Sequence, residues 1–249
     1  MTKPVGNGRR STRLILGSLA VAVATWGFLG WFGLPDQTDS GAAHSVTWHR
    51  TSIVVGFCFL LFPVTAYYRR QVTATRLLTL AGIGLSVAFI PGPELNDVSF
   101  QWFADMLSLL FVMLGLGLLL NFSLAFPDRR DWLSSKLRVF LLYLPPLLAW
   151  ALAVFYSLSV LIPAVIGSYA LLVLWFVITG WLRSTREMRQ RLALNEMLAG
   201  ALLGGLPWAV AVVTDHVAGS DVLPGQSWYF ASLVLIPVLW ANSAGLSRV

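Results

Sequence analysis

The feature that most constrains this chain is a series of apolar blocks of about 20 residues, separated by short charged or Pro/Gly-containing segments. At 1.5 Å per residue, a helix of about 20 residues crosses the roughly 30 Å hydrocarbon core of a bilayer. Charged residues make up 11% of the 249 and the mean hydropathy is +0.75, whereas a soluble domain has about 25% charged residues. Too few polar side chains remain to cover a soluble globule, so the sequence predicts an integral membrane protein.

The blocks predict an all-α, polytopic bundle of about eight transmembrane helices, with residues 1–249 forming a single membrane domain. The first block has the outline of a signal peptide, but its apolar run exceeds a typical h-region, so we expect an uncleaved span. The third block is the weakest, and Arg76 must reach outward from it to the headgroups. The predicted spans are 14–34, 51–68, 76–92, 102–126, 138–157, 160–182, 196–214 and 227–245.

The distribution of charge predicts that both ends of the chain lie in the cytoplasm. With the N-terminus inside and eight spans, 16 of the 17 basic residues fall in inside segments and only Arg50 falls outside. Seven of the eleven acidic residues fall outside or at the outer interface. Cytoplasmic loops of membrane proteins carry an excess of Lys and Arg. A topology with a missed or extra span would instead place many basic residues on both sides of the membrane. We therefore predict a multi-pass protein of the bacterial cytoplasmic (inner) membrane.

Two polar residues inside the spans are candidates for a functional role. Ionisable groups deep in a bilayer mark ion paths or proton relays, and Asp105 is the best placed, about one turn inside the fourth span. The interpretation we favour places it at the outer headgroup level, in reach of water. Asn121 lies toward a cytoplasmic end, where interhelical hydrogen bonding is the ordinary explanation.

The three histidines lie on the predicted outer side. His44, His49 and His216, with nearby aspartates, could form a metal-binding or pH-sensing cluster. Their spacing matches no known ligand signature, and solvated loop residues are the simpler account. A changed acid or metal response in a His49/His216 double variant would support the cluster, and an unchanged response would remove it.

Two further patterns concern packing and lipid contact. Gly200-x-x-x-Gly204 offers a flat helix face for close helix approach or dimerisation. Prolines in or near the spans, such as Pro63 and Pro146, predict kinks of a kind common in membrane helices. The basic segment 183–195 predicts contact with anionic lipids, since each arginine near an anionic leaflet contributes about 1 kcal/mol. The arginines concerned are Arg183, Arg186, Arg189 and Arg191.

The sequence carries no sign of enzymatic chemistry. It contains no Gly-rich phosphate loop, no HExxH and no Gly-x-Ser-x-Gly, and its acidic residues are few and scattered. The basic residues sit between apolar blocks, as in cytoplasmic loops, so nucleic-acid binding is not expected despite a pI near 10. Cys58 is the only cysteine, so no intramolecular disulfide can form. The sequence indicates no particular cofactor.

One region is similar to a known family. The segment 118–130 (LLLNFSLAFPDRR), followed by 141–146 (LLYLPP), 188–191 (MRQR), 202–207 (LLGGLP) and 232–237 (SLVLIP), resembles the N-terminal multi-span membrane region of bacterial sensor histidine kinases. That region often has histidine where Asn121 stands. The kinase core that would follow, with its phospho-acceptor helix and ATP-binding domain, has no counterpart in these 249 residues. The resemblance therefore implies a detached sensory or scaffold module.

These features lead to two functional hypotheses of different classes. The first is a non-enzymatic sensor or signal-transducing module that acts on a protein partner through helix packing and cytoplasmic loops. The second is an accessory structural subunit of a larger membrane complex, whose apolar and aromatic residues face partner proteins or pigments. A transporter is disfavoured because intramembrane ionisable residues are scarce. The ligand, the partner and the oligomeric state are not specified by the sequence.

Overall fold

The computed structural model describes residues 6–32, 42–90, 98–127, 133, 135–156, 158, 161–207 and 231–246. Within these ranges the chain is helical apart from short turns, and no β-strand occurs. The prediction of an all-α fold is confirmed for this part of the chain. Because lipid offers no hydrogen-bond partners to the backbone, a helix that bonds its own N–H and C=O groups is the structure such apolar segments can adopt.

The helices coincide with the predicted apolar blocks. Each of the first six blocks corresponds to one helix, whereas residues 208–230, from within the seventh block to the start of the eighth, lie outside the described residues. The elements are α1 (Gly6–Phe32), α2 (Ala42–Arg69), α3 (Thr73–Phe89), α4 (Val98–Ala125), α5 (Lys136–Tyr156), α6 (Leu161–Arg183), α7 (Arg186–Arg191), α8 (Leu194–Ala199), the π-helix η2 (Gly200–Gly205), the 3₁₀ turn η3 (Ser232–Val234) and α11 (Leu235–Leu246).

Four of the described helical segments are long and apolar enough to cross a membrane. Three shorter apolar segments accompany them, over Thr12–Thr25, Thr73–Phe89 and Ser232–Leu246. This content of long apolar helices is what an integral membrane protein requires. The four long segments are Arg50–Arg69, Gln101–Ala125, Lys136–Tyr156 and Leu161–Arg183.

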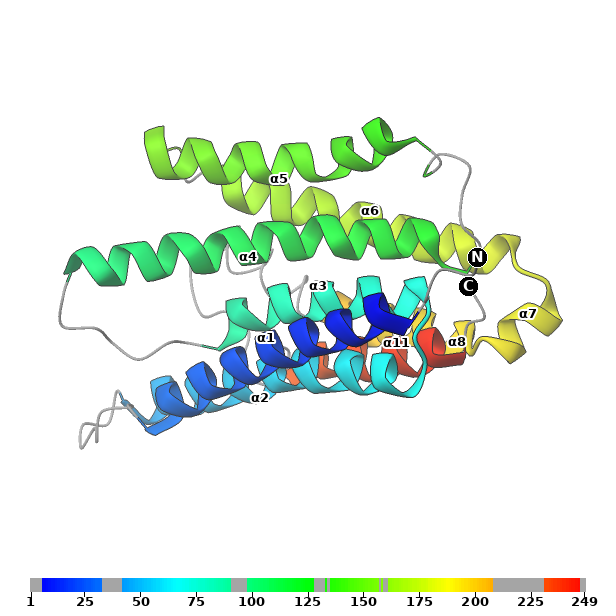
Figure 1. Cartoon of the computed structure of the whole chain (residues 1–249), viewed down its shortest axis with the longest axis horizontal. Helices are drawn as coiled ribbons and strands as arrows, with labels where there is room; N and C mark the ends of the chain where they lie inside the picture. The colour runs from blue at the N-terminus through cyan, green and yellow to red at the C-terminus, as the bar shows by residue number, and fades with distance from the viewer. Residues whose placement is uncertain are drawn as a thin grey trace.

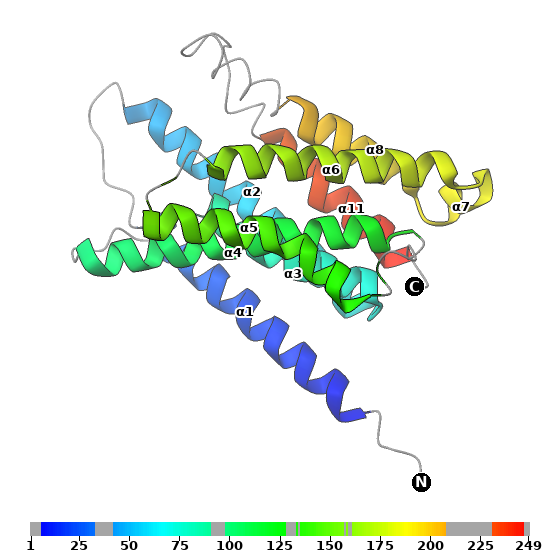
Figure 2. The same cartoon turned by 90° about the horizontal axis from the view of Figure 1, so that it is seen from above.

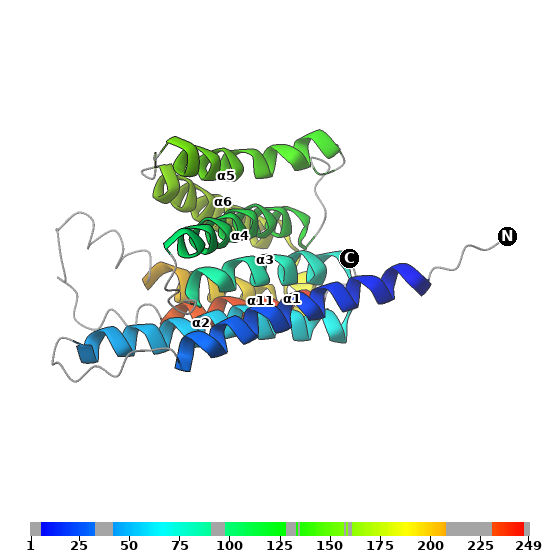
Figure 3. The same cartoon turned by 60° about the vertical axis from the view of Figure 1, so that its left-hand side comes forward.

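The helices run roughly along one axis and form a layered bundle (Figure 1). α1, α2 and α11 lie on one side, α3 and α4 occupy the middle, and α5 and α6 form the opposite side (Figure 3). α1 crosses the others obliquely at the edge of the bundle (Figure 2). The two outer helices, α5 and α6, therefore pack on the rest chiefly through α4.

The short helix α3 lies at the centre, in contact with α1, α2, α4 and α11. Ten of its seventeen residues are buried. Its polar side chains bond to backbone: the Thr79 hydroxyl donates to the Pro63 and Thr75 carbonyls, both at 2.7 Å, and the Ser86 hydroxyl donates to Ile83 at 2.7 Å. The block predicted to be the weakest span because of its short length is thus the most enclosed helix of the described bundle.

Glycine lets α3 approach its neighbours on two sides. A methyl group built on Gly84 would lie 2.6 Å from the Phe111 carbonyl oxygen and 3.0 Å from Gly115 Cα, both on α4. A methyl group on Gly82 would overlap the Phe59 carbonyl of α2. Close backbone approach through small residues is the main route to helix association where lipid removes the hydrophobic driving force.

Prolines leave carbonyl groups that neighbouring helices satisfy. Pro146 has no N–H to bond the Leu142 carbonyl one turn earlier, and the Tyr169 hydroxyl of α6 donates to that oxygen at 2.5 Å. Pro63 frees the Phe59 carbonyl in the same way, at the point where Gly82 lets α3 close on α2. Pro63 and Pro146 therefore lie at helix–helix contacts in this bundle.

Candidate functional site

Apart from Arg50 and Asp105, the charged side chains that the structure describes gather at one end of the bundle, which we call the basic end. It consists of the starts of α1, α3 and α5, the ends of α2, α4, α6 and α11, and all of α7 and α8 (Figure 1). Contacts between distant segments agree with this picture: the Tyr68 hydroxyl of α2 donates to the Arg13 carbonyl of α1 at 3.2 Å. The basic residues with described side chains at this end are Arg13, Arg69, Arg70, Arg76, Lys136, Arg138, Arg183, Arg186, Arg189 and Arg191.

Arg189 connects α7 to the end of α6. Its Nε donates to the Trp181 carbonyl at 2.9 Å and its Nη2 donates to the Leu182 carbonyl at 3.3 Å. The guanidinium also lies 3.9 Å from the centroid of the Trp181 ring. A cation on the carbonyls of the last helical turn offsets the negative end of the helix dipole, and the aromatic face adds a cation–π attraction. Arg189 therefore holds α7 against α6.

A second group of hydrogen bonds connects α6 and α8. A left-handed residue, Ala193 with φ of 49°, turns the chain from α7 into α8. The Trp181 indole then donates to the Asn195 side-chain oxygen at 2.7 Å. The end of α6 is thus tied both to α7, through Arg189, and to α8.

Three further bonds connect this region to α11. The Trp240 indole donates to the Met197 carbonyl at 2.9 Å, Asn242 donates to the Glu196 carboxylate at 2.6 Å, and the Ser243 hydroxyl donates to Leu192. We call the bonds of Trp181, Arg189, Trp240, Asn242 and Ser243 the polar network. It links the end of α6 to the end of α11 through α7 and α8.

Arg70 caps α11 from the turn between α2 and α3. Its Nη1 donates to the carbonyl of Leu246 at 3.0 Å and to that of Gly245 at 3.4 Å, among the carbonyls left without an N–H partner at the helix end. This contact joins residues 175 and 176 positions apart. The end of α11 is therefore held by both the polar network and Arg70.

We expect Arg70→Gln to lower the unfolding free energy by about 1 kcal/mol, because a cation on helix C-terminal carbonyls contributes up to that much. Thermal unfolding of the purified protein in detergent measures the change. Arg76→Gln is the matched control, since Arg76 is exposed at the start of α3. Equal stability losses in the two variants would contradict the capping role.

The structure separates the four arginines predicted to contact anionic lipid. Arg183, Arg186 and Arg191 are exposed, whereas Arg189 is half-buried on Trp181. Arg191 pairs with Glu187 one turn earlier, but both side chains are about 70% exposed, so the pair adds little stability. Three of the four side chains therefore face outward from the basic end.

The two candidate polar residues of α4 lie in different settings. Asp105 is exposed near the start of α4, where it accepts a hydrogen bond from the Gln101 side chain at 3.0 Å. Asn121 is buried near the other end and donates to the Tyr143 hydroxyl of α5 at 2.9 Å. The exposure of Asp105 fits a carboxylate at headgroup level, and the Asn121 bond joins α4 to α5.

The histidine cluster falls largely outside what the structure describes. His44 and His49 lie in the first turns of α2, while His216 lies outside the described residues. Among the described residues, no group of three or more His, Cys, Asp or Glu is arranged to hold a metal ion. The metal or pH-sensing cluster stays a prediction.

Gly200 and Gly204 face α11. A methyl group on Gly200 would lie 3.1 Å from the Leu235 carbonyl oxygen, and one on Gly204 would lie 3.0 Å from that of Ser232. The Ser232 hydroxyl donates to the Gly204 carbonyl at 2.8 Å. The flat face formed by Gly200 and Gly204 is therefore covered by the segment from η3 to α11 of the same chain.

Sequence reasoning missed the principal contacts of the basic end and of α3. The basic segment after α6 did not indicate that Arg189 turns back onto Trp181, or that Arg70 reaches α11. The glycines of α3 did carry a signal, since Gly82 and Gly84 stand in the weakest apolar block. Small residues in a short span indicate an enclosed helix, not a lipid-facing one.

The site is thus an electropositive helix-end surface built on a polar network. Its chemistry suits contact with anionic groups or a protein partner. The chain matches no protein-family model, no curated protein and no solved structure.

Proposed function

We propose that the chain is a multi-pass protein of the bacterial cytoplasmic membrane, with eight spans and the basic end in the cytoplasm. The gathering of ten described basic side chains at one end of the bundle supports this orientation, because Lys and Arg concentrate in cytoplasmic loops. The four long apolar segments support insertion in a bilayer. The eight-span topology adds the first, third, seventh and eighth blocks as membrane-crossing segments.

Cysteine labelling in intact cells tests the topology. In a Cys58→Ser background, we expect Ser99→Cys to react with a membrane-impermeant maleimide, since residue 99 lies at the start of α4, away from the basic end. Lys136→Cys and Gln190→Cys should react only after permeabilisation, because both positions belong to the basic end. Labelling of positions 99 and 136 from the same side would overturn the proposed orientation.

Within this topology, the chain acts as a non-enzymatic sensory module that transmits a signal to a protein partner. The observation that carries the proposal is the polar network, which joins α6 to α11 by hydrogen bonds at the basic end. A shift of α6, an outer helix, would move α7 and α8 and so the exposed arginines. Arg183, Arg186 and Arg191 form the surface that a cytoplasmic partner contacts.

A pull-down in mild detergent tests the partner. We expect a protein with a cytoplasmic signalling domain to co-purify with the wild-type chain, and we expect a triple Gln variant at Arg183, Arg186 and Arg191 to lose it. The matched control is a triple Gln variant at Arg76, Lys136 and Arg138, which are exposed at the same end but outside α6 and α7. Equal loss in both variants would indicate non-specific charge attraction and contradict the assigned surface.

A second function is favoured by the outer faces of α5 and α6. Phe155, Tyr156 and Trp175 are 71%, 72% and 61% exposed, as an accessory subunit requires if its aromatic side chains pack on partner proteins or pigments. Co-purification in fixed stoichiometry with a large membrane complex, unaffected by the triple Gln variants, would favour this function. Substrate-dependent flux in liposomes would favour a transporter over both.

A further inference from the structure

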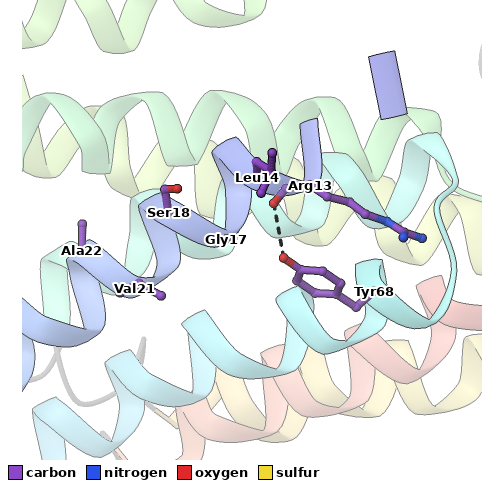
Figure 4. Close-up of a pocket in the computed structure, with 7 residues that line it drawn as sticks. All are labelled: Arg13, Leu14, Gly17, Ser18, Val21, Ala22 and Tyr68. Carbon is purple, nitrogen blue, oxygen red and sulfur yellow. Dashed lines mark hydrogen bonds between the residues drawn. The ribbon is translucent and has the colours of Figure 1, made fainter. Parts of the chain in front are cut away.

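An open groove lies between the start of α1 and the end of α2, away from the polar network. Its volume is about 880 Å³, within the range of ordinary ligand sites. Figure 4 shows Tyr68 pointing from α2 to the backbone of α1, with the side chain of Arg13 directed toward the end of α2. The groove is lined chiefly by Arg13, Gly17, Ser18, Val21, Ala22 and Tyr68.

α1 packs on its neighbours near its start, through buried Leu16, as well as farther along, and the groove lies beside these contacts. A methyl group on Gly27 would lie 2.6 Å from Ile90 Cγ2, so α1 is in tight contact with the end of α3. At the start of α1, the Tyr68 hydroxyl reaches the Arg13 carbonyl at 3.2 Å. Gly17 leaves room for that hydroxyl, because a Cβ there would lie 2.8 Å from it. The groove thus lies next to the point where Tyr68 of α2 bonds to the backbone of α1.

The lining changes in polarity along its length. Arg13 is exposed at the mouth, at the basic end, and the side-chain amide of Gln71 lies against its guanidinium. About one and a half and two and a half turns farther along α1, Ser18 and Ala22 present small side chains that are exposed. A cationic mouth followed by a mainly apolar lining suits the polarity of a charged headgroup followed by a hydrocarbon chain.

The charge around the groove is of one sign. No Asp or Glu occurs in residues 1–35 or 50–93, which include most of both helices that form it. Arg69 is exposed at the end of α2, and Arg9 and Arg10 precede Arg13 by about one turn of helix. A zwitterionic headgroup would gain little here, whereas an anionic headgroup meets only cations.

We propose that this groove is a binding site for one anionic phospholipid. The phosphate-bearing headgroup lies on the Arg13 guanidinium, and one acyl chain runs along Gly17, Ser18 and Ala22 on α1. The placement of the headgroup at the cytoplasmic leaflet rests on the proposed topology, but the affinity of the groove for the lipid does not. The site is separate from the exposed arginines of α6 and α7, which would meet the leaflet surface only as a diffuse field of charge.

Native mass spectrometry of the full chain in detergent, titrated with phosphatidylglycerol or phosphatidylcholine, tests the site. We expect one phosphatidylglycerol to bind preferentially and Arg13→Gln to weaken it about fivefold, as the loss of one interfacial arginine implies. Arg138→Gln is the charge-matched control, because Arg138 is exposed at the same end but outside the groove. Equal effects of the two variants, or equal binding of the two lipids, would overturn the site.

A second pair of variants tests the acyl-chain floor. Ala22→Leu fills the groove without changing charge, and we expect it to reduce lipid retention while leaving the folded monomer intact. Ala170→Leu adds the same bulk to an exposed position of α6 and should leave retention unchanged. If both leave retention unchanged, or if Ala22→Leu instead dissociates a dimer seen by mass, the lipid assignment is wrong. Because these measurements are made in detergent, their failure leaves the topology to be decided by the cysteine labelling alone.

Discussion

Replacement of Gly84 by leucine is expected to prevent recovery of folded, monodisperse protein in detergent. The new Cβ would lie 2.6 Å from the Phe111 carbonyl oxygen and 3.0 Å from Gly115 Cα, and both are backbone atoms of α4 that cannot rotate away. Overpacking of a close contact costs about 1–3 kcal/mol and occasionally more, and here it separates the two central helices. Size-exclusion chromatography after mild solubilisation measures the loss.

The control for Gly84 is another helical glycine of the same chain. A methyl group built on Gly167 of α6 would meet nothing within 4 Å, so Gly167→Leu should elute as the wild type does. Gly84→Ala provides a graded test, since its smaller side chain should permit folding but lower the thermal midpoint. Equal behaviour of Gly84→Leu and Gly167→Leu would show that the contact of α3 with α4 does not hold the bundle together.

Trp240→Ala is expected to lower the unfolding free energy by about 3 kcal/mol. Trp240 is 2% exposed, its ring centroid lies 5.7 Å from that of Phe122, and its indole bonds the Met197 carbonyl. Lipid tails are as apolar as the protein interior, so burial of the ring away from lipid adds little to the unfolding free energy. The decrease in the variant comes instead from the cavity, the missing packing contacts and the unmade hydrogen bond. Thermal unfolding in detergent measures the shift.

Two matched variants separate these contributions. Trp175→Ala removes the same side chain from a position on α6 that is 61% exposed, and it should change the midpoint little. Trp240→Phe keeps an aromatic ring but removes the indole donor. Its thermal midpoint should therefore fall between those of Trp175→Ala and Trp240→Ala. A Trp240→Ala midpoint close to that of Trp175→Ala would contradict the buried position of the ring.

The sequence predicted the helices well because each is encoded locally. Residues 138–157 and 160–182 were predicted as spans, and α5 and α6 occupy Lys136–Tyr156 and Leu161–Arg183. A run of apolar residues between charges leaves the backbone no partner in lipid but itself, so helix position follows from composition. The break between the two helices likewise follows from the short segment that separates the two apolar runs.

The contacts between helices were harder to predict, because they depend on geometry that a single sequence does not encode locally. Nothing near Arg70 in the sequence indicates that it caps a helix ending at Leu246, 176 positions later. Arg189 shows the same limit: four arginines in one segment look equivalent, yet only this one turns back onto Trp181. Arg189 reaches Trp181 because the chain breaks between the end of α6 at Arg183 and the start of α7 at Arg186.

The central position of α3 has a consequence for how the protein is made. Its 17 residues span about 25 Å as a helix, less than the roughly 30 Å thickness of the hydrocarbon layer. Alone in a bilayer, such a helix would have to thin the membrane around it or pull charged ends inward. Flanked by α2 and α4, it meets protein instead of lipid, and the mismatch disappears. In the proposed eight-span topology, a nascent chain that ends after α3 would lack one of these flanks, so we expect stable integration of α3 to require the synthesis of α4.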